Sequence, residues 1–334
     1  MMQKKVSIIG VGGRTGTMFA FELGKAAHVK GVARKKEVGL VRENKLYIKN
    51  SDGGETLFKE EMIEDTDFNE NLCPDIFLLA TRNPISNPLK FYLSCCKDKK
   101  PTFIISQNGI EAIKDAQKAI LEIMGEEKEK IRLVRAILFN PVDKKRFEDW
   151  VCIQYSLPIK GAFAKVMGPG NVEDIAVLFE KSGFQFEQFP SSEARNIEFS
   201  KLFLNLIGMA SASRGLSIRK GFQDKKIFEE EVKALKEYVR VVHKSGGRFL
   251  NFNTYSVGDY ALVVGKTPLW LISLFRKKIT EIIAKGREGK PKVLDEIDYY
   301  NGAVVKLGKE VGVETPANQE IWKRAKKRIN SRQQ

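Results

Sequence analysis

The chain has 334 residues, of which 43% are hydrophobic, so it is long enough for two domains and can bury a sizeable core. No apolar run reaches the roughly 18 residues that span a bilayer, and the start, MMQKKVSIIG, has too short an apolar run for a signal peptide, so we expect a cytoplasmic protein without a membrane span. The net charge of +15 favours anionic partners, but the lysines are spread along the chain and no nucleic-acid-binding module is recognisable, so nucleic-acid binding is not expected as the main function.

Two residue types that often carry chemistry are scarce. The two histidines, His28 and His243, are both predicted to lie at the surface, so we expect acid–base chemistry to use lysine, aspartate or glutamate. The four cysteines show neither a C-x-x-C pair nor the spacing of a zinc site. They are expected to be reduced thiols, and no metal site is predicted.

The first half of the chain alternates short apolar runs with helical patterns. This alternation predicts a Rossmann-type α/β domain over residues 1–190, with a doubly wound parallel sheet and antiparallel additions. A hairpin is expected over 39–57, with its turn near Asp52-Gly53-Gly54. The predicted strands are 6–10, 29–34, 75–81, 101–106, 133–138, 151–157, 162–168 and 184–189, and the predicted helices include 17–27, one from about 88, and 110–123.

After about residue 190 the pattern changes to a period of 3.6 residues. Residues 191–334 are therefore predicted to form a separate all-α domain. The predicted helices are 193–215, 228–244, 268–286, 294–312 and 318–330.

The stretch IIGVGGRTG is a strand that runs into glycines and then into a helix, which is the context of a dinucleotide-binding fingerprint. Gly10 allows the tight turn, and Gly12 lets the backbone approach a pyrophosphate at the helix N-terminus. The third position of the fingerprint is imperfect, because Thr15 stands where a glycine is expected and Gly16 follows it. A purely structural glycine turn is the alternative. The predicted cofactor-binding residues of this loop are Gly10, Val11, Gly12, Gly13, Arg14 and Thr15.

The second strand ends in VARKK, where a site for NAD would usually place an acid to hold the ribose 2′-hydroxyl. Arg34 stands there instead, and a guanidinium can hold a 2′-phosphate with two hydrogen bonds. We therefore predict NADPH as the cofactor. The alternative is that these residues are ordinary surface charges.

The stretch EFSKLFLNL places a lysine among apolar residues of a predicted helix. Lys201 and Asn205 lie about 40° apart on one helical face, with apolar residues on both sides of this narrow polar stripe. Lys201 either extends its ammonium into water or is a buried amine kept for proton transfer or for holding a carboxylate.

Four pieces of the chain, in this order, carry a family resemblance: the N-terminal glycines, ISQNGI with Asn108, SKLFLN with Lys201 and Asn205, and DEIDYYNG with Glu296. Together they make the chain similar, over nearly its whole length, to the ketopantoate reductase family of the 6-phosphogluconate-dehydrogenase-like superfamily. The resemblance implies that a Rossmann domain binds NADPH, that a helical domain closes over it, and that a 2-oxo acid lies in the cleft.

The resemblance also implies roles for particular residues. Lys201 matches the lysine that gives a proton to the carbonyl oxygen, and Glu296 matches the glutamate that hydrogen-bonds the substrate hydroxyl. Asn108 matches an asparagine that contacts cofactor and substrate, and Asn205 is expected to contact the substrate. The chemistry of the residues agrees, because reduction of a ketone needs a proton donor and no histidine is at hand.

Two arginines complete the set that the resemblance implies. Arg34 matches the arginine that holds the 2′-phosphate, and Arg82 stands where the family often has a lysine that contacts the cofactor. The activity implied is the reduction of 2-dehydropantoate (ketopantoate) to pantoate with NADPH, a step of pantothenate biosynthesis.

Some residues depart from the family pattern. These departures weaken the prediction of the substrate more than the prediction of the reaction type. Met209 stands where a second asparagine is usual, which favours a larger or more apolar ligand, and the serine usually found before Glu296 is missing. Two alternatives stay open: a dehydrogenase of another 2-oxo or 3-hydroxy acid or an opine, and a non-catalytic NADP(H)-binding protein. A homodimer is also left open.

Overall fold

In a computed structural model of the protein, which describes residues 4–284 and 289–331, the chain divides into two compact units. Unit 1 contains the residues up to Gln107 and Ala112–Ala194, and unit 2 contains Asn108–Glu111 and the residues from Arg195 onward. The four residues Asn108–Glu111 thus belong to unit 2, although they follow a strand of unit 1 in the sequence.

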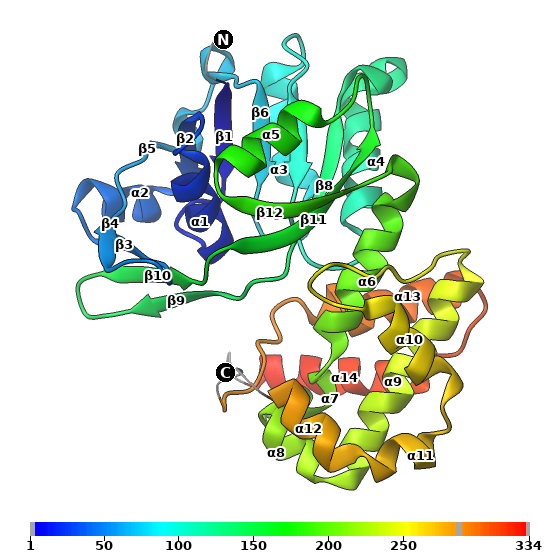
Figure 1. Cartoon of the computed structure of the whole chain (residues 1–334). Helices are drawn as coiled ribbons and strands as arrows, with labels where there is room; N and C mark the ends of the chain where they lie inside the picture. Colours follow the sequence, from blue (N-terminus) through cyan, green and yellow to red (C-terminus); the bar gives the residue numbers. More distant parts are fainter. Residues whose placement is uncertain (1–3, 285–288, 332–334) are drawn as a thin grey trace. The chain divides into compact units, whose positions relative to one another are not determined.

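Unit 1 is built on two sheets (Figure 1). The larger one is parallel except where β11 runs antiparallel to β8, and the smaller one contains the predicted hairpin as the antiparallel pair β3 and β4. The predicted α/β fold class is confirmed. In spatial order the larger sheet contains β12 (Phe184–Phe189), β11 (Ile159–Met167), β8 (Leu133–Leu138), β7 (Thr102–Ile105), β6 (Ile76–Leu79), β1 (Lys5–Ile9), β2 (His28–Ala33) and β5 (Glu61–Glu64), and the smaller contains β4 (Glu55–Leu57), β3 (Leu46–Lys49), β10 (Val151–Tyr155) and β9 (Val142–Arg146).

The central strands are short apolar runs because helices cover both faces of the sheet. Every residue of β6 and of β7 is buried. Strand β1 pairs with β2 on one side and with β6 on the other, so the order of the strands reverses at β1 and β6. In open α/β sheets this switch point, at the carboxyl ends of the strands, is where ligands bind.

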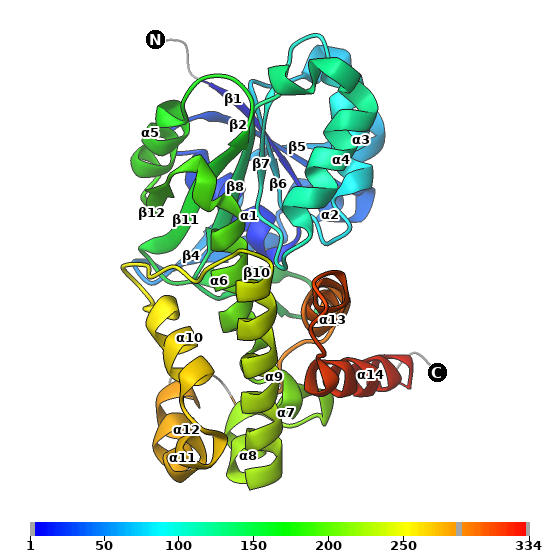
Figure 2. The same ribbon diagram turned by 90° about the vertical axis from the view of Figure 1, so that its right-hand side faces the viewer.

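The helices of unit 1 lie on opposite faces of the larger sheet. Figure 2 shows α3 and α4 on one face and α5 on the other. Helix α1 shares the face of α5, because Phe19 of α1 stacks on Phe184, which also contacts Phe179 of α5. The helices are α1 (Arg14–Leu23), α2 (Lys35–Arg42), α3 (Ser86–Cys96), α4 (Ala112–Met124) and α5 (Glu173–Lys181).

Two expectations for unit 1 were wrong. The segment expected to begin the hairpin at residue 39 is instead the second half of helix α2, and the hairpin strands are confined to β3 and β4. The four cysteines are not all reduced, because Cys73 and Cys96 form a disulfide that joins the segment before β6 to the end of α3. Cys95 and Cys152 are free.

Unit 2 is helical, as predicted, and α9 is its longest helix. Neighbouring helices pack on α9 along its length, and Glu237 of α9 accepts hydrogen bonds from the backbone amides of Ala317 and Asn318 at the start of α14. The helices are α6 (Ala194–Leu206), α7 (Met209–Ser213), α8 (Ile218–Gln223), α9 (Lys225–Lys244), α10 (Val257–Lys266), α11 (Leu269–Leu274), α12 (Arg276–Ala284), α13 (Asn301–Glu310) and α14 (Pro316–Asn330).

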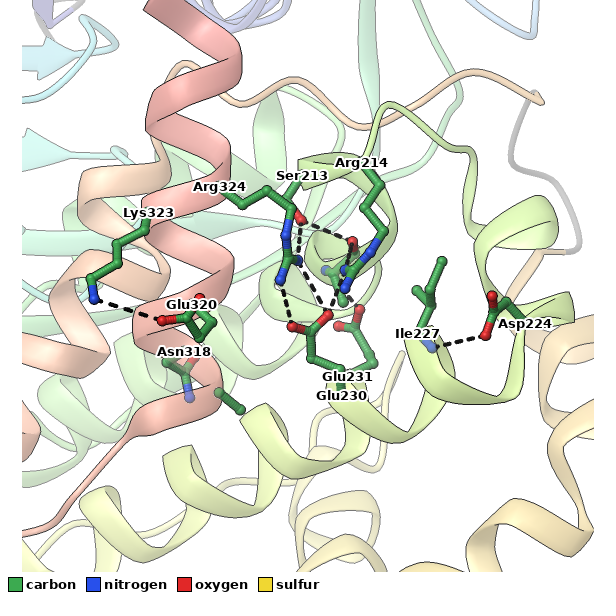
Figure 3. A network of polar contacts seen from close by, with 12 residues as sticks. Ser213, Arg214, Asp224, Ile227, Glu230, Glu231, Asn318, Glu320, Lys323 and Arg324 are labelled. Atoms are coloured by element: carbon green, nitrogen blue, oxygen red, sulfur yellow. Dashed lines mark hydrogen bonds and ion pairs between the residues drawn. The ribbon is translucent and has the colours of Figure 1, made fainter.

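A half-buried ionic network also ties α14 to the rest of unit 2 (Figure 3). Glu230 of α9 accepts hydrogen bonds from Arg324 of α14 and from Arg214, which follows α7. Burial alone would raise the pKa of Glu230, but the hydrogen bonds and positive charges of Arg324 and Arg214 lower it.

Two predicted helices of unit 2 are interrupted. The helix expected over 193–215 breaks into α6 and α7 at Gly208, whose φ of 94° is in the left-handed region that favours glycine. The helix expected over 268–286 is split between α11 and α12 at Phe275, and its last two residues lie outside the described part of the chain. The helix expected over 294–312 begins later than predicted, because α13 starts at Asn301 after a single 3₁₀ turn. Within residues 4–284 and 289–331, no helix is long and apolar enough to cross a membrane.

Candidate functional site

The predicted cofactor loop lies at the switch point of the larger sheet of unit 1. Gly10 follows β1 with a φ of 95°, and a Cβ there would lie 3.1 Å from the carbonyl oxygen of Ala80, the residue after β6. A side chain at position 10 would therefore meet both backbone strain and the neighbouring strand. The loop can come this close to β6 only because it begins with glycine.

Gly16 takes the structural role of the third glycine of the fingerprint, which is to let the helix pack closely. A Cβ on Gly16 would lie closer than 3.0 Å to the carbonyl group of Gly10, so α1 packs against the loop only without a side chain there. Thr15 occupies the expected third position, but the close packing is displaced by one residue to Gly16. The imperfect spacing in the sequence thus still allows the close packing of α1 for which the third glycine of the fingerprint serves.

Thr17 closes the glycine loop from inside α1. Its hydroxyl accepts a hydrogen bond from the backbone N–H of Gly12 at 2.9 Å and donates one to the carbonyl oxygen of Gly13 at 2.8 Å. Arg14 and Thr15 are the first two residues of α1, so the predicted loop runs directly into a helix N-terminus, where an anion is favoured.

Arg34 lies at the start of α2, and its side chain is 79% exposed. Its Nη2 atom is 2.7 Å from Oε1 of Glu37, one turn further along the same helix. Lys144 of β9 donates a hydrogen bond to the carbonyl oxygen of Gly12. Arg34 and Lys144, from segments distant in the sequence, therefore both lie near the glycine loop. The other predicted cofactor-binding arginine, Arg82, lies in the loop after β6 and has an exposed side chain.

Unit 2 brings together three of the other predicted residues. The Nδ2 group of Asn108 donates a hydrogen bond to Oε2 of Glu296 at 3.2 Å, and Nδ2 of Asn205 donates one to Oδ1 of Asn108 at 3.2 Å. The hydroxyl of Tyr300 is also 3.2 Å from Oε2 of Glu296. Two amides and a carboxylate from three distant parts of the sequence thus form one hydrogen-bonded chain.

Lys201 lies on α6 one turn before Asn205, and its side chain is partly buried. The residues that follow it, Leu202 and Phe203, are fully buried, so Lys201 and Asn205 form a narrow polar stripe in the second half of this helix. This is the pattern that the sequence predicted for Lys201 and Asn205. The stripe places an ammonium on the same side of α6 as the amide that contacts Asn108.

The segment that carries Asn108 is fixed in unit 2 by two contacts. Gly109 has a φ of 101°, and a Cβ there would lie 2.8 Å from the carbonyl oxygen of Tyr299. Glu111 forms an ion pair with Lys306 of α13. The glycine after Asn108 is therefore needed for the close approach that brings Asn108 to Glu296.

Two residues that the sequence analysis missed hold the end of α6. The ammonium of Lys292 donates to the carbonyl oxygens of Asn205 and Ile207, at 2.8 and 3.0 Å. The carboxylate of Glu231 accepts from the backbone N–H groups of Gly208 and Ala210. These contacts satisfy the backbone at the break between α6 and α7, and so stabilise the helix end that carries Asn205.

A third missed residue is Arg135 in β8, which is fully buried. Its guanidinium donates hydrogen bonds to the carbonyl oxygens of Ile105 and Gln107, at the end of β7. No pattern marks Arg135 in the sequence, because its partners are backbone oxygens. It stabilises the strand end from which the Asn108 segment departs.

The residue that differs from the family pattern on α6, Met209, does not lie on the polar stripe. Met209 begins α7 beyond the break at Gly208, and its side chain is fully buried. It packs in the interior of the protein and offers no exposed surface to a ligand. The expectation that Met209 favours a larger ligand therefore has no support from its position.

Comparison with protein families accounts for both units. Residues 6–144 match the model of ketopantoate reductase PanE/ApbA, and residues 193–328 match the model of the C-terminal domain of the same family. The chain belongs to the ketopantoate reductase family. It is accordingly an oxidoreductase that acts on a CH–OH group.

Solved structures with the ketopantoate reductase fold cover nearly the whole chain. The family member from Ralstonia eutropha is 15% identical, with a TM-score of 0.74 over 99% of this chain and 100% of that one. D-mandelate dehydrogenase, determined with NADH and anilino(oxo)acetate, is 16% identical, with a TM-score of 0.70 over 98% of both chains. The 2-dehydropantoate 2-reductase from Methylococcus capsulatus is 15% identical, with a TM-score of 0.66 over 98% of this chain and 97% of that one. A search of curated proteins gave no match.

Proposed function

We propose that this member of the ketopantoate reductase family reduces a 2-oxo acid with NADPH, and that ketopantoate is its first candidate substrate. The observation that carries the proposal is the hydrogen-bonded chain of Asn205, Asn108 and Glu296, with Lys201 one helical turn from Asn205. This arrangement sets a proton donor and a carboxylate acceptor within one unit, which is what the reduction of a carbonyl group requires. Pantothenate biosynthesis in the cytoplasm is the setting that this activity implies.

Different residues of the chain have different roles in the proposed reduction. NADPH supplies a hydride to the carbonyl carbon when it is bound. The ammonium of Lys201 gives a proton to the carbonyl oxygen, and its charge stabilises the negative charge that develops there. Glu296 accepts a hydrogen bond from a hydroxyl of the substrate, and its carboxylate is held in place by Asn108 and Tyr300.

The direction of the amide hydrogen bonds supports the role of Glu296. Asn205 donates to Oδ1 of Asn108, so the other end of the Asn108 side chain, its NH₂ group, faces Glu296. A donor directed at Glu296 leaves the carboxylate to act as a hydrogen-bond acceptor. The chain of amides therefore matches an acceptor role for Glu296.

The proposal of NADPH rests on unit 1. Gly10 and Gly16 leave the space that a dinucleotide-binding loop needs, and the loop leads into the N-terminus of α1. Arg34 stands where an acid would repel a 2′-phosphate, and its guanidinium is exposed. Positive charge beside the loop favours the cofactor that carries the additional phosphate.

The test is the oxidation of NADPH by the purified protein with ketopantoate, beside a panel of 2-oxo acids. Lys201→Ala is expected to reduce kcat by about 10²- to 10⁴-fold, the usual contribution of a general acid. Lys220→Ala, which removes an exposed lysine from α8, is the matched control and is expected to keep full activity. NADPH binding without turnover of any 2-oxo acid would contradict the proposed reaction and favour a non-catalytic NADP(H)-binding protein.

The panel also tests a second candidate substrate. Structures of D-mandelate dehydrogenase, one of them with anilino(oxo)acetate, have the same fold over nearly the whole chain. A 2-oxo acid with an aromatic side chain therefore belongs in the panel, with NADH as well as NADPH. Higher kcat/KM with the aromatic 2-oxo acid than with ketopantoate would establish this alternative.

A further inference from the structure

In the glycine loop of unit 1, the side chain of Glu37 packs against Gly12. A Cβ on Gly12 would lie closer than 3.0 Å to both Cβ and Cγ of Glu37, so the stem of Glu37 packs directly against this glycine. In a dinucleotide-binding loop, the second glycine lacks a side chain so that the backbone can approach the pyrophosphate. Here Glu37 lies against that glycine.

The carboxylate of Glu37 interacts with two cations, Arg34 and Lys144. Its Oε1 is paired with Arg34, and Lys144, which is bound to the carbonyl oxygen of Gly12, is attracted by it. Burial lowers the pKa of Lys144, as does repulsion by Arg146, Lys36 and Arg34, while Glu37 raises it. One carboxylate thus interacts with two cations, Arg34 and Lys144, and Arg146 and Lys36 add positive charge around Lys144. This excess of positive charge suits a ligand with more negative charge than Glu37 supplies.

The hydrogen bonding of the Glu37 carboxylate is also incomplete. Its Oε2 is buried, and within the described part of the chain it has no hydrogen-bond partner. A buried carboxylate oxygen without a donor is unfavourable, whereas a phosphate group could use the same cations with more oxygens. A phosphate that binds the same cations can therefore replace the Glu37 carboxylate.

We propose that Glu37 is a resident anion that the 2′-phosphate of NADPH displaces, and that Lys144 becomes a ligand of this phosphate beside Arg34. The inference rests on the proposed function, because it assumes that unit 1 binds NADPH. On binding, Arg34 exchanges the Glu37 carboxylate for the phosphate, and Glu37 moves away from Gly12. Glu37 thereby lowers the affinity for NADPH, while Lys144 raises it.

The experiment measures dissociation constants of NADPH and NADH by titration of the full-length protein, for the wild type and three variants. Glu37→Gln keeps the shape of the side chain and removes its charge, so it is expected to lower the Kd of NADPH about fivefold and to leave that of NADH within twofold. Lys144→Met is expected to raise the Kd of NADPH about tenfold or more, and that of NADH much less. Glu43→Gln, at the exposed end of α2, is the matched control and should change neither constant.

Three results would overturn the inference. An unchanged NADPH affinity in Glu37→Gln would show that Glu37 does not compete with the phosphate. An equal gain for NADPH and NADH would assign the displacement to the pyrophosphate, and a weaker affinity for NADH would make Glu37 a ligand of the ribose. Failure of the wild type to bind either dinucleotide would instead overturn the proposed function, and this inference with it.

Discussion

Asn205 donates a hydrogen bond from Nδ2 to Oδ1 of Asn108, a residue 97 positions earlier in the chain, at 3.2 Å. This bond fixes which end of the Asn108 amide faces Glu296. An amide turned the other way would direct an oxygen at a carboxylate oxygen and lose the hydrogen bond. Asn205 therefore acts on Glu296 through Asn108.

Asn205→Asp is predicted to impair the reaction more than Asn205→Ala. The aspartate cannot donate to Asn108, so Asn108 is driven to turn its NH₂ group toward position 205 and its oxygen toward Glu296. We expect kcat/KM to fall about 10- to 100-fold, equivalent to a lost hydrogen bond with an unpaired partner. Steady-state kinetics with the best 2-oxo acid measures this. Asn330→Asp, at the end of α14, is the control, and equal effects of Asn205→Asp and Asn205→Ala would contradict the role of amide orientation.

Gly16→Ala and Gly39→Ala are predicted to have opposite effects on stability, although both place alanine in a helix of unit 1. A Cβ at position 16 collides with the Gly10 carbonyl, which should lower the free energy of unfolding by about 1–3 kcal/mol and weaken cofactor binding. A Cβ at position 39 meets no atom within 4 Å, so alanine there should raise it by about 0.5–1 kcal/mol. Urea unfolding of both variants decides the matter, and similar stability changes would refute the packing role of Gly16.

Arg34→Asp is predicted to shift the cofactor preference toward NADH. The carboxylate would repel a 2′-phosphate and could accept a hydrogen bond from a ribose 2′-hydroxyl. It would also replace the ion pair between positions 34 and 37 by two like charges. The ratio of kcat/KM for NADPH to that for NADH is the measurement. An unchanged ratio would remove Arg34 from the cofactor site.

The sequence predicted the elements whose burial is regular. Strands β6 and β7 are fully buried and apolar apart from Thr102, and the glycine loop follows β1 as the pattern indicated. Helix α2 was missed because Val38 is its one fully buried residue, which leaves little periodicity to detect. Strand β9 was missed for a similar reason, since of its residues Val142 alone is buried and its form depends on pairing with β10.

The candidate site was predicted from the sequence as far as its side chains carry a recognisable motif. Asn108, Lys201, Asn205 and Glu296 were all named, but the hydrogen bonds that join Asn108 to Glu296 and to Asn205 follow from the fold. Lys292 could not be recognised, because it lies in a glycine- and lysine-rich segment that looks like a surface loop, and its partners are carbonyl oxygens more than 80 residues away. A side chain whose partners are backbone atoms leaves no pattern in the sequence.

The disulfide predicts a specific thiol count. In denatured protein prepared without reductant, two thiols should react with a thiol reagent, those of Cys95 and Cys152, and four should react after reduction. Replacing Cys73 and Cys96 by serine should lower the free energy of unfolding by about 3 kcal/mol. The two cysteines are 23 positions apart in the sequence, and a cross-link that closes a loop of this length restricts the unfolded chain. Four reactive thiols without reduction would show that the bond does not form.

The adjacent residues Glu230 and Glu231 are predicted to give opposite dependences of stability on pH. Burial raises the pKa of Glu231 to about 7, with backbone N–H donors at Ala210 and Gly208 offsetting part of the effect. Between its ordinary value of 4.5 and about 7, the folded protein holds a proton that the unfolded chain has lost. Stability from this group is therefore present at low pH and declines as the pH rises through this range, by about 3 kcal/mol.

Glu230 is the matched comparison, because Arg324 and Arg214 lower its pKa despite its burial (Figure 3). Its contribution is present above its ordinary pKa and is lost as the pH falls and the carboxylate is protonated in the ion-paired site. Glu231→Gln should flatten the loss of stability between pH 4.5 and 7, and Glu230→Gln should flatten the loss on the acid side. Urea unfolding from pH 3 to 8 distinguishes the two, and a Glu231→Gln variant that keeps the decline toward pH 7 would show that another group is responsible.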